Sequence, residues 1–148
     1  MEGASNKVQG HYGASTRVIK NIMKLDMGHL EVMFKEICKA LCEDPHLDTL
    51  VFFCDYGKHR SVGAENLTSN AMRRVSSAWH IKGVIHCMRE YWSRKKCGWK
   101  SCQECDDMNE DKETAYSEAA QLFRQLWNER VIKQQQRFLA MIARSPQR

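Results

Sequence analysis

The feature that most constrains the fold of this chain is an apolar run over 47–54 that stops at a short polar loop. Only Asp48 and Thr49 interrupt the run, so we predict a strand that is covered on both faces. A helical pattern follows over 62–75, with apolar residues spaced three or four apart among polar ones. A strand, a loop and a helix in this order are typical of a crossover unit in a parallel sheet.

Four further segments extend this pattern. The segments 17–22 and 81–87 are rich in β-branched residues and predict two more strands. The segments 30–41 and 111–144 carry apolar residues at helical spacing and predict two more helices. The alternation of strands and helices predicts a small, three-layer, Rossmann-like α/β domain with a short, mainly parallel sheet and a long C-terminal helix.

The chain of 148 residues is long enough for one domain to bury a core without disulfides. We predict a flexible leader over 1–13, an α/β domain over 14–130 and a helical, basic tail over 131–148. The leader has no apolar core segment, which argues against a secretory signal.

Composition favours the cell interior. Seven cysteines, an odd number, suit reduced thiols or a metal site better than a disulfide framework. We therefore predict a cytoplasmic protein, with the nucleus as the alternative. No segment is apolar over the length that crosses a bilayer, so we expect no membrane partner. The net charge of +5 permits a polyanionic partner, although scattered surface Lys and Arg are the commoner explanation.

The loop after the first apolar run predicts an anion site. Cys54, Gly57, Arg60 and Ser61 have the spacing Cys-x2-Gly-x2-Arg-Ser at the expected start of a helix. Backbone N–H groups at a helix start attract anions, and Arg can clamp a phosphate with two hydrogen bonds. We expect a phosphorylated small molecule, phosphate or sulfate to bind here. The candidate ligand-binding residues are Cys54, Asp55, Tyr56, Gly57, Lys58, His59, Arg60 and Ser61.

A phosphatase is the alternative function for the same loop. Cys54 and Arg60 also satisfy the Cys-x5-Arg-Ser signature of cysteine-dependent phosphatases, in which a thiolate attacks phosphorus. Such an enzyme needs a general acid, for which Asp106, Asp107 and His86 are candidates.

Three thiols close together predict a structural zinc site. Cys97, Cys102 and Cys105 lie within one short segment, and Cys-x2-Cys lets two thiolates bind one tetrahedral ion. His86 or Cys87 can supply the fourth ligand, which makes 86–105 a zinc-stapled loop. The alternative is a reduced, cysteine-rich loop without metal.

Two further interactions stay open. Trp92 and Trp99 stand among Arg and Lys residues, a pattern that an RNA-binding module could use for stacking and phosphate contacts. The end of the long helix, with an apolar stripe after a polar stretch, is a candidate surface for homo-oligomer formation.

The sequence CDYGKHRSVGAENL resembles a Gly-Cys-Thr-Gly-Gly-x-His-Arg-Ser-Val stretch of the RapZ C-terminal-domain family. The matching residues are Cys54, Gly57, His59, Arg60, Ser61, Val62, Ala64, Glu65 and Leu67. A later segment, Val84-Ile85-His86, is similar to a strand end of that family. The resemblance implies a Rossmann-like fold whose loop holds a phosphorylated sugar, with RNA binding and oligomer formation in the adapter members. This chain departs from the family at Asp55 and Tyr56, which replace the small Thr-Gly pair.

Overall fold

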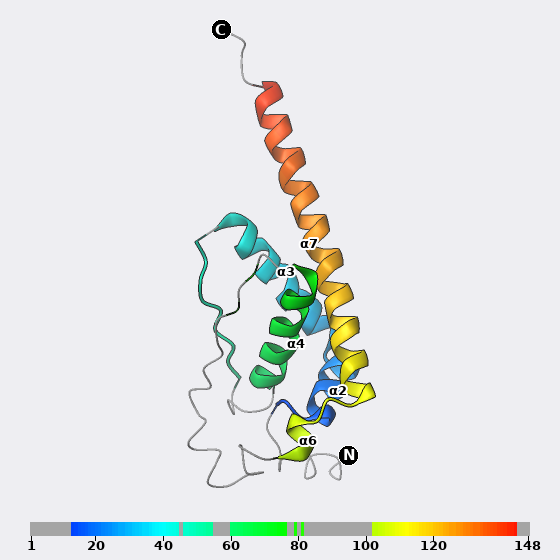
Figure 1. The fold of residues 1–148 in the computed structure, drawn as a ribbon. Helices are drawn as coiled ribbons and strands as arrows, with labels where there is room; N and C mark the ends of the chain where they lie inside the picture. The colour runs from blue at the N-terminus through cyan, green and yellow to red at the C-terminus, as the bar shows by residue number, and fades with distance from the viewer. Residues whose placement is uncertain are drawn as a thin grey trace.

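The computed structural model describes residues 13–44, 46–54, 60–76, 79, 81 and 102–144. In chain order, the helices are α2 (Thr16–Leu25), α3 (Met27–Glu43), α4 (Arg60–Val75), α6 (Gln103–Asp106) and α7 (Glu110–Arg144). These described ranges contain no strand (Figure 1). The prediction of a Rossmann-like α/β domain with a parallel sheet is therefore wrong, and the described part of the chain is all-helical.

The first predicted strand, 17–22, is a helix instead. It lies inside α2, whose N-cap residue Ser15 accepts a hydrogen bond from the backbone N–H of Val18 at 3.4 Å. Val18, Ile19, Ile22 and Met23 are all buried, and their spacing places them on one helix face. Burial of this face outweighs the modest β preference of its branched residues.

The second predicted strand, 47–54, is extended but has no ladder partner among the described residues. Val51 and Phe53 are 79% and 89% exposed, whereas Phe52 is half-buried and packs against the core. Only one side of this segment is covered, so the prediction of a strand buried on both faces is wrong. Of the third predicted strand, 81–87, only Ile81 lies within the described residues, where it is half-buried.

The other predicted helices are present. The pattern over 30–41 lies in α3, which begins directly after Asp26 and ends at Glu43. The patterns over 62–75 and 111–144 correspond to α4 and α7. These three segments are helical because their apolar residues recur three or four positions apart, without an internal Pro.

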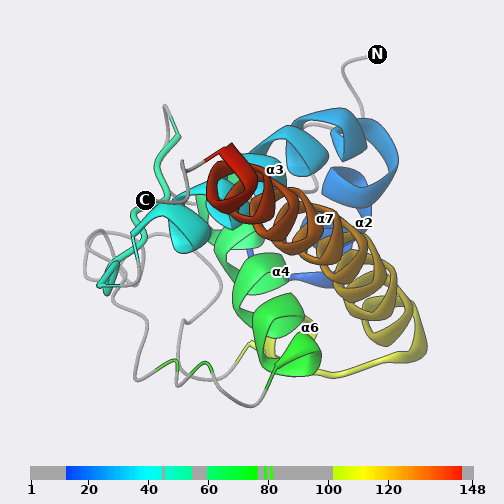
Figure 2. The same ribbon diagram turned by 90° about the horizontal axis from the view of Figure 1, so that it is seen from above.

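The core lies between α7 and the three helices that pack along its first half (Figures 1 and 2). Phe34 and Phe123 are both fully buried at its centre, edge to face, with 5.0 Å between ring centroids. Trp79 meets Phe123 at 5.9 Å and Trp127 at 4.9 Å, also edge to face. This row of rings ties α3 and the segment after α4 to the middle of α7.

Helices α2 and α4 cross at Gly63. A Cβ atom on Gly63 would lie 2.4 Å from Ile22 Cδ1 and 3.2 Å from the carbonyl oxygen of Gly13. Glycine is thus the residue that permits this approach of the two helices.

Polar contacts fasten α2 to the start of α7. The side-chain amide of Asn109 donates to Thr16 Oγ1 at 2.9 Å, and Lys20 Nζ donates to Asp111 Oδ2 at 2.8 Å. Asn109 also caps α7, because its Oδ1 accepts from the backbone N–H of Lys112 at 3.0 Å. The beginning of the helical body is therefore joined to its last helix.

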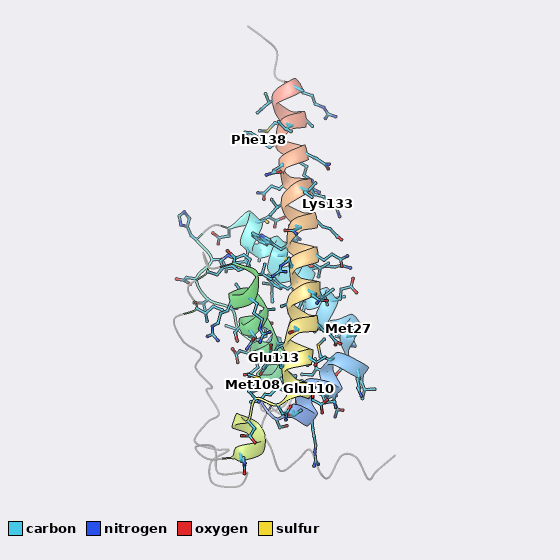
Figure 3. All side chains as sticks on the ribbon, turned by 45° about the vertical axis from the view of Figure 1, so that its right-hand side comes forward. Met27, Met108, Glu110, Glu113, Lys133 and Phe138 are labelled. Atoms are coloured by element: carbon cyan, nitrogen blue, oxygen red, sulfur yellow. The ribbon has the colours of Figure 1, made fainter. Side chains whose placement is uncertain are left out.

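Beyond this body, α7 continues as a projecting helix (Figures 1 and 3). Arg130 pairs with Glu43, and Gln134 Nε2 donates to the carbonyl oxygen of Cys42 at 3.0 Å. Every residue over 132–144 is exposed. The helix runs without a break across 130 and 131, where we predicted a boundary between domain and tail. We call 131–144 the α7 extension.

Candidate anion site at the start of α4

Three of the eight predicted ligand-binding residues are described. They are Cys54, at the end of the extended segment, and Arg60 and Ser61, in the first turn of α4. Asp55, Tyr56, Gly57, Lys58 and His59 lie outside the described residues. The structure therefore shows only how the two ends of the predicted anion-binding loop lie relative to each other.

The structure brings these two ends together. The Cys54 thiol donates to Ser61 Oγ, with 3.3 Å between sulfur and oxygen. Ser61 is buried and Cys54 is half-buried. α4 starts at Arg60, two residues before the helical pattern predicted over 62–75, and the thiol, the hydroxyl and the helix N-terminus share one region.

The charges around the start of α4 favour an anion. Arg60 is exposed, and no described carboxylate pairs with it. The first turn of α4 has no acidic residue. The unpaired N–H groups of a first helical turn and the helix dipole both attract negative charge. The Arg60 guanidinium and the N-terminus of α4 therefore both attract an anion to this region.

Glu65, one turn further along α4, is a half-buried carboxyl group. Burial raises its pKa above the usual range, and a hydrogen bond from Ser69 opposes this rise. Within the described residues its Oε1 is buried without a hydrogen-bond partner. Glu65 forms no ion pair with Arg60, so it does not neutralise that guanidinium in the described part of the chain.

The predicted zinc site is described only in part. Cys105 is buried, Cys102 is half-buried, and the backbone N–H of Cys105 donates to the carbonyl oxygen of Cys102 at 3.0 Å. The other candidate ligands, His86, Cys87 and Cys97, lie outside the described residues. Across the described ranges, no three His, Cys, Asp or Glu side chains form a group that could hold a metal ion. Zinc binding stays a prediction.

The remaining predicted groups are also only partly described. Asp107, a candidate general acid, is exposed at the end of α6, while His86 lies outside the described residues. Trp92 and Trp99, the aromatic residues of the RNA-binding alternative, lie outside them as well. The alternative of an RNA-binding module therefore stays a prediction.

Sequence reasoning missed a buried lysine beside the cysteine pair. Lys112 is 3% exposed, and its Nζ donates to the carbonyl oxygens of Cys105 at 2.7 Å and of Asp107 at 3.3 Å. A cation placed on these carbonyl groups is favourable at the end of a helix. Nothing in the sequence distinguishes Lys112 from the solvent-exposed lysines of an amphipathic helix.

Comparison with protein-family models, with curated proteins and with solved structures finds no match for this chain. The resemblance to the RapZ C-terminal-domain family therefore stays a prediction, and the described fold does not show the sheet that it implied. Within the described ranges, no helix combines the length and apolar character that a membrane span requires.

Proposed function

We propose that the start of α4 binds the phosphate group of a small phosphorylated molecule. One observation carries the proposal: the Cys54 thiol lies 3.3 Å from Ser61 Oγ, directly beside the exposed Arg60. The extended segment therefore ends at the helix N-terminus, where an anion is most favoured.

The expected contacts follow from the chemistry of these groups. The Arg60 guanidinium is planar, stays charged and matches two phosphate oxygens. Interaction with a helix N-terminus contributes roughly 0.3–1 kcal/mol for an exposed anion. Because this contribution is small, most of the affinity at this site depends on Arg60.

The same contact supports a second candidate, a cysteine-dependent phosphatase. A hydroxyl group at hydrogen-bond distance can donate to a thiolate, and a thiolate is the nucleophile of such enzymes. In this function Cys54 attacks phosphorus and Arg60 steadies the transferring group. Cys54→Ser separates the two candidates, because it removes the nucleophile and leaves Arg60 in place.

Titration calorimetry with inorganic phosphate and with an amino-sugar phosphate tests the proposal. Arg60→Ala should weaken binding at least tenfold, whereas Arg73→Ala, a matched change at the other end of α4, should leave it unchanged. Equal binding by wild type and Arg60→Ala would remove the site from consideration. Turnover of p-nitrophenyl phosphate that disappears in Cys54→Ser would identify the phosphatase instead.

A further inference from the structure

The α7 extension has an exposed apolar face, which we call the apolar seam. It consists of the half-buried Val131 and of four residues that are each more than half exposed, Ile132, Phe138, Leu139 and Ile142. At about 100° per residue, these side chains fall within a sector of roughly 120° around the helix axis. The seam is therefore one continuous surface along the extension.

The apolar seam points away from the helical body. The side chains that bury the first half of α7, among them Phe123 and Leu126, are centred about 130° from the seam around the helix axis. The extension also projects beyond α3 and α4 (Figures 1 and 3). A helix that packs on the seam would therefore lie to one side of the described helices rather than in their place.

The cations of the extension lie on the side opposite the seam. Lys133, Arg137 and Arg144 are centred about 180° from it around the axis. Figure 3 shows Lys133 and Phe138 projecting to different sides of the helix. The residues of the seam and those that flank it, over 131–132, 134–135, 138–139 and 141–142, include no charged side chain. Two copies packed seam to seam would therefore keep their cations apart and avoid like-charge repulsion at the contact.

The spacing of the seam suits pairing with a second copy. Val131, Gln135, Phe138 and Ile142 follow one another at intervals of four, three and four residues, as the d and a positions of a coiled coil do. These intervals read the same in both directions. A two-fold axis between 136 and 137 therefore aligns two antiparallel copies, with Val131 opposite Ile142 of the partner subunit and Phe138 opposite Gln135 of the partner subunit. A two-fold interface requires such a self-complementary surface.

The choice of partner and the orientation both follow from charge. Charged residues at the e and g positions usually direct a helix to a different partner, and this seam has none there. Arg124 is exposed and lies two heptads before Phe138, on the same line along α7. Parallel copies would bring the two Arg124 side chains together, which is unfavourable, whereas antiparallel copies place them at opposite ends.

We propose that two copies of this chain associate through the apolar seams of their α7 extensions, in antiparallel orientation. The overlap is about 21 Å long, which is about two heptads. A standard stable interface uses roughly 20–30 residues on each side, more than the extension provides. The dimer is therefore weak and forms as the protein concentration rises.

Sedimentation equilibrium of the full chain, from micromolar to millimolar concentration, tests this proposal. The average mass should rise from 17.2 kDa towards twice that value. Phe138→Ala with Ile142→Ala should weaken association at least tenfold. Gln135→Leu should strengthen it several-fold, because a polar residue at an a position costs stability. Lys133→Gln with Arg137→Gln, a matched double change on the opposite face, should alter association less than twofold.

Four outcomes would overturn the proposal. A chain that stays monomeric at every concentration has no such dimer, and a dimer that survives Phe138→Ala with Ile142→Ala uses another surface. Stronger association in Arg124→Gln would indicate parallel copies, since the antiparallel pair keeps the two arginines apart. A monomeric chain that binds phosphatidylcholine vesicles, and loses this binding in the Phe138 and Ile142 double variant, would assign the seam to a lipid surface. Circular dichroism of each variant checks that the helices are intact.

Discussion

Arg74 holds both carboxylate oxygens of Glu113. Its Nη1 donates to Oε1 at 2.7 Å and its Nη2 donates to Oε2 at 2.8 Å. The pair joins the last turn of α4 to the first turn of α7, and Nη1 also lies 3.2 Å from Ser117 Oγ. This two-point geometry fixes the crossing of α4 and α7 at the end opposite the candidate anion site.

The pair makes stability depend on pH in the acid range. Hydrogen bonds from Arg74 lower the pKa of Glu113 below its usual range. The carboxylate therefore stabilises the folded chain above the unfolded pKa of about 4.3, and this contribution is lost as the pH falls through the lowered value. Glu113→Gln should lower the urea midpoint at pH 7 and converge with wild type in strong acid. Because both groups are solvent-exposed, we expect a small difference that salt reduces further.

Glu118→Gln is the matched control, because Glu118 is exposed on the same helix and has no such arginine clamp. Its midpoint should follow wild type across the whole pH range. If the urea midpoint of Glu118→Gln changes as much as that of Glu113→Gln, then net charge, rather than the contact with Arg74, causes the change in stability.

Phe123 is, with Phe34, one of the two largest fully buried side chains among the described residues. It is fully buried against Phe34 and Trp79. Phe123→Ala should lower the free energy of unfolding by about 3–5 kcal/mol. Phe138→Ala, on the exposed extension of the same helix, should change it by less than about 0.5 kcal/mol. Urea unfolding followed by circular dichroism measures both, and equal losses would contradict the assignment of the core.

Two glycines should respond in opposite directions to the same change. Gly63→Ala places a methyl group 2.4 Å from Ile22 Cδ1 and should destabilise the fold by about 1–3 kcal/mol. Gly28→Ala, with nothing within 4 Å of the added atom, should stabilise α3 by about 0.4–1 kcal/mol.

Ile22→Val tests whether the Gly63 contact is the cause. It removes the Cδ1 atom that the new methyl group would meet, so the double variant should be less destabilised than the sum of the single changes. If the destabilisation of the double variant in thermal melts equals the sum of the two single changes, the contact with Ile22 Cδ1 is not the cause of the Gly63→Ala effect.

The half-buried carboxyl group of Glu65 should oppose folding at neutral pH. Burial raises its pKa, so the folded state favours the protonated form. The associated stability is present below the unfolded pKa of about 4.3 and is lost as the pH rises through the raised value. Glu65→Gln should therefore be more stable than wild type at pH 7, with a gap that closes towards pH 4. Glu36→Gln, an exposed change on α3, should show no such trend in the same urea titrations.

The helices α3, α4 and α7 could be predicted from sequence because their apolar residues recur three or four positions apart over a long segment without Pro. The helix α2 could not, because Val18, Ile19 and Ile22 are β-branched and the segment is short enough to satisfy either pattern. The extended segment before Cys54 misled the prediction of fold class for a related reason. Its apolar run predicts a fully buried strand, yet Phe53 is almost fully exposed. The sequence pattern of a segment does not show which of its side chains the rest of the protein covers.

At the candidate site, Cys54 lies beside Ser61 at the start of α4, whereas the predicted loop residues between them lie outside the described residues. The buried position of Lys112 could not be predicted, because it depends on α6 turning back towards α7. Contacts of that kind arise from tertiary packing between segments and leave no periodic signal in the sequence.

The contacts of Thr16 with Asn109 and of Lys20 with Asp111 have a kinetic consequence. They link residues 93 and 91 positions apart in the chain. A ribosome adds about 5–20 residues per second, so α2 is complete roughly 5–20 seconds before its partners on α7 have been made. During that interval its apolar face lacks the helix that later covers it. The contacts between α2 and α7 therefore form only late in synthesis.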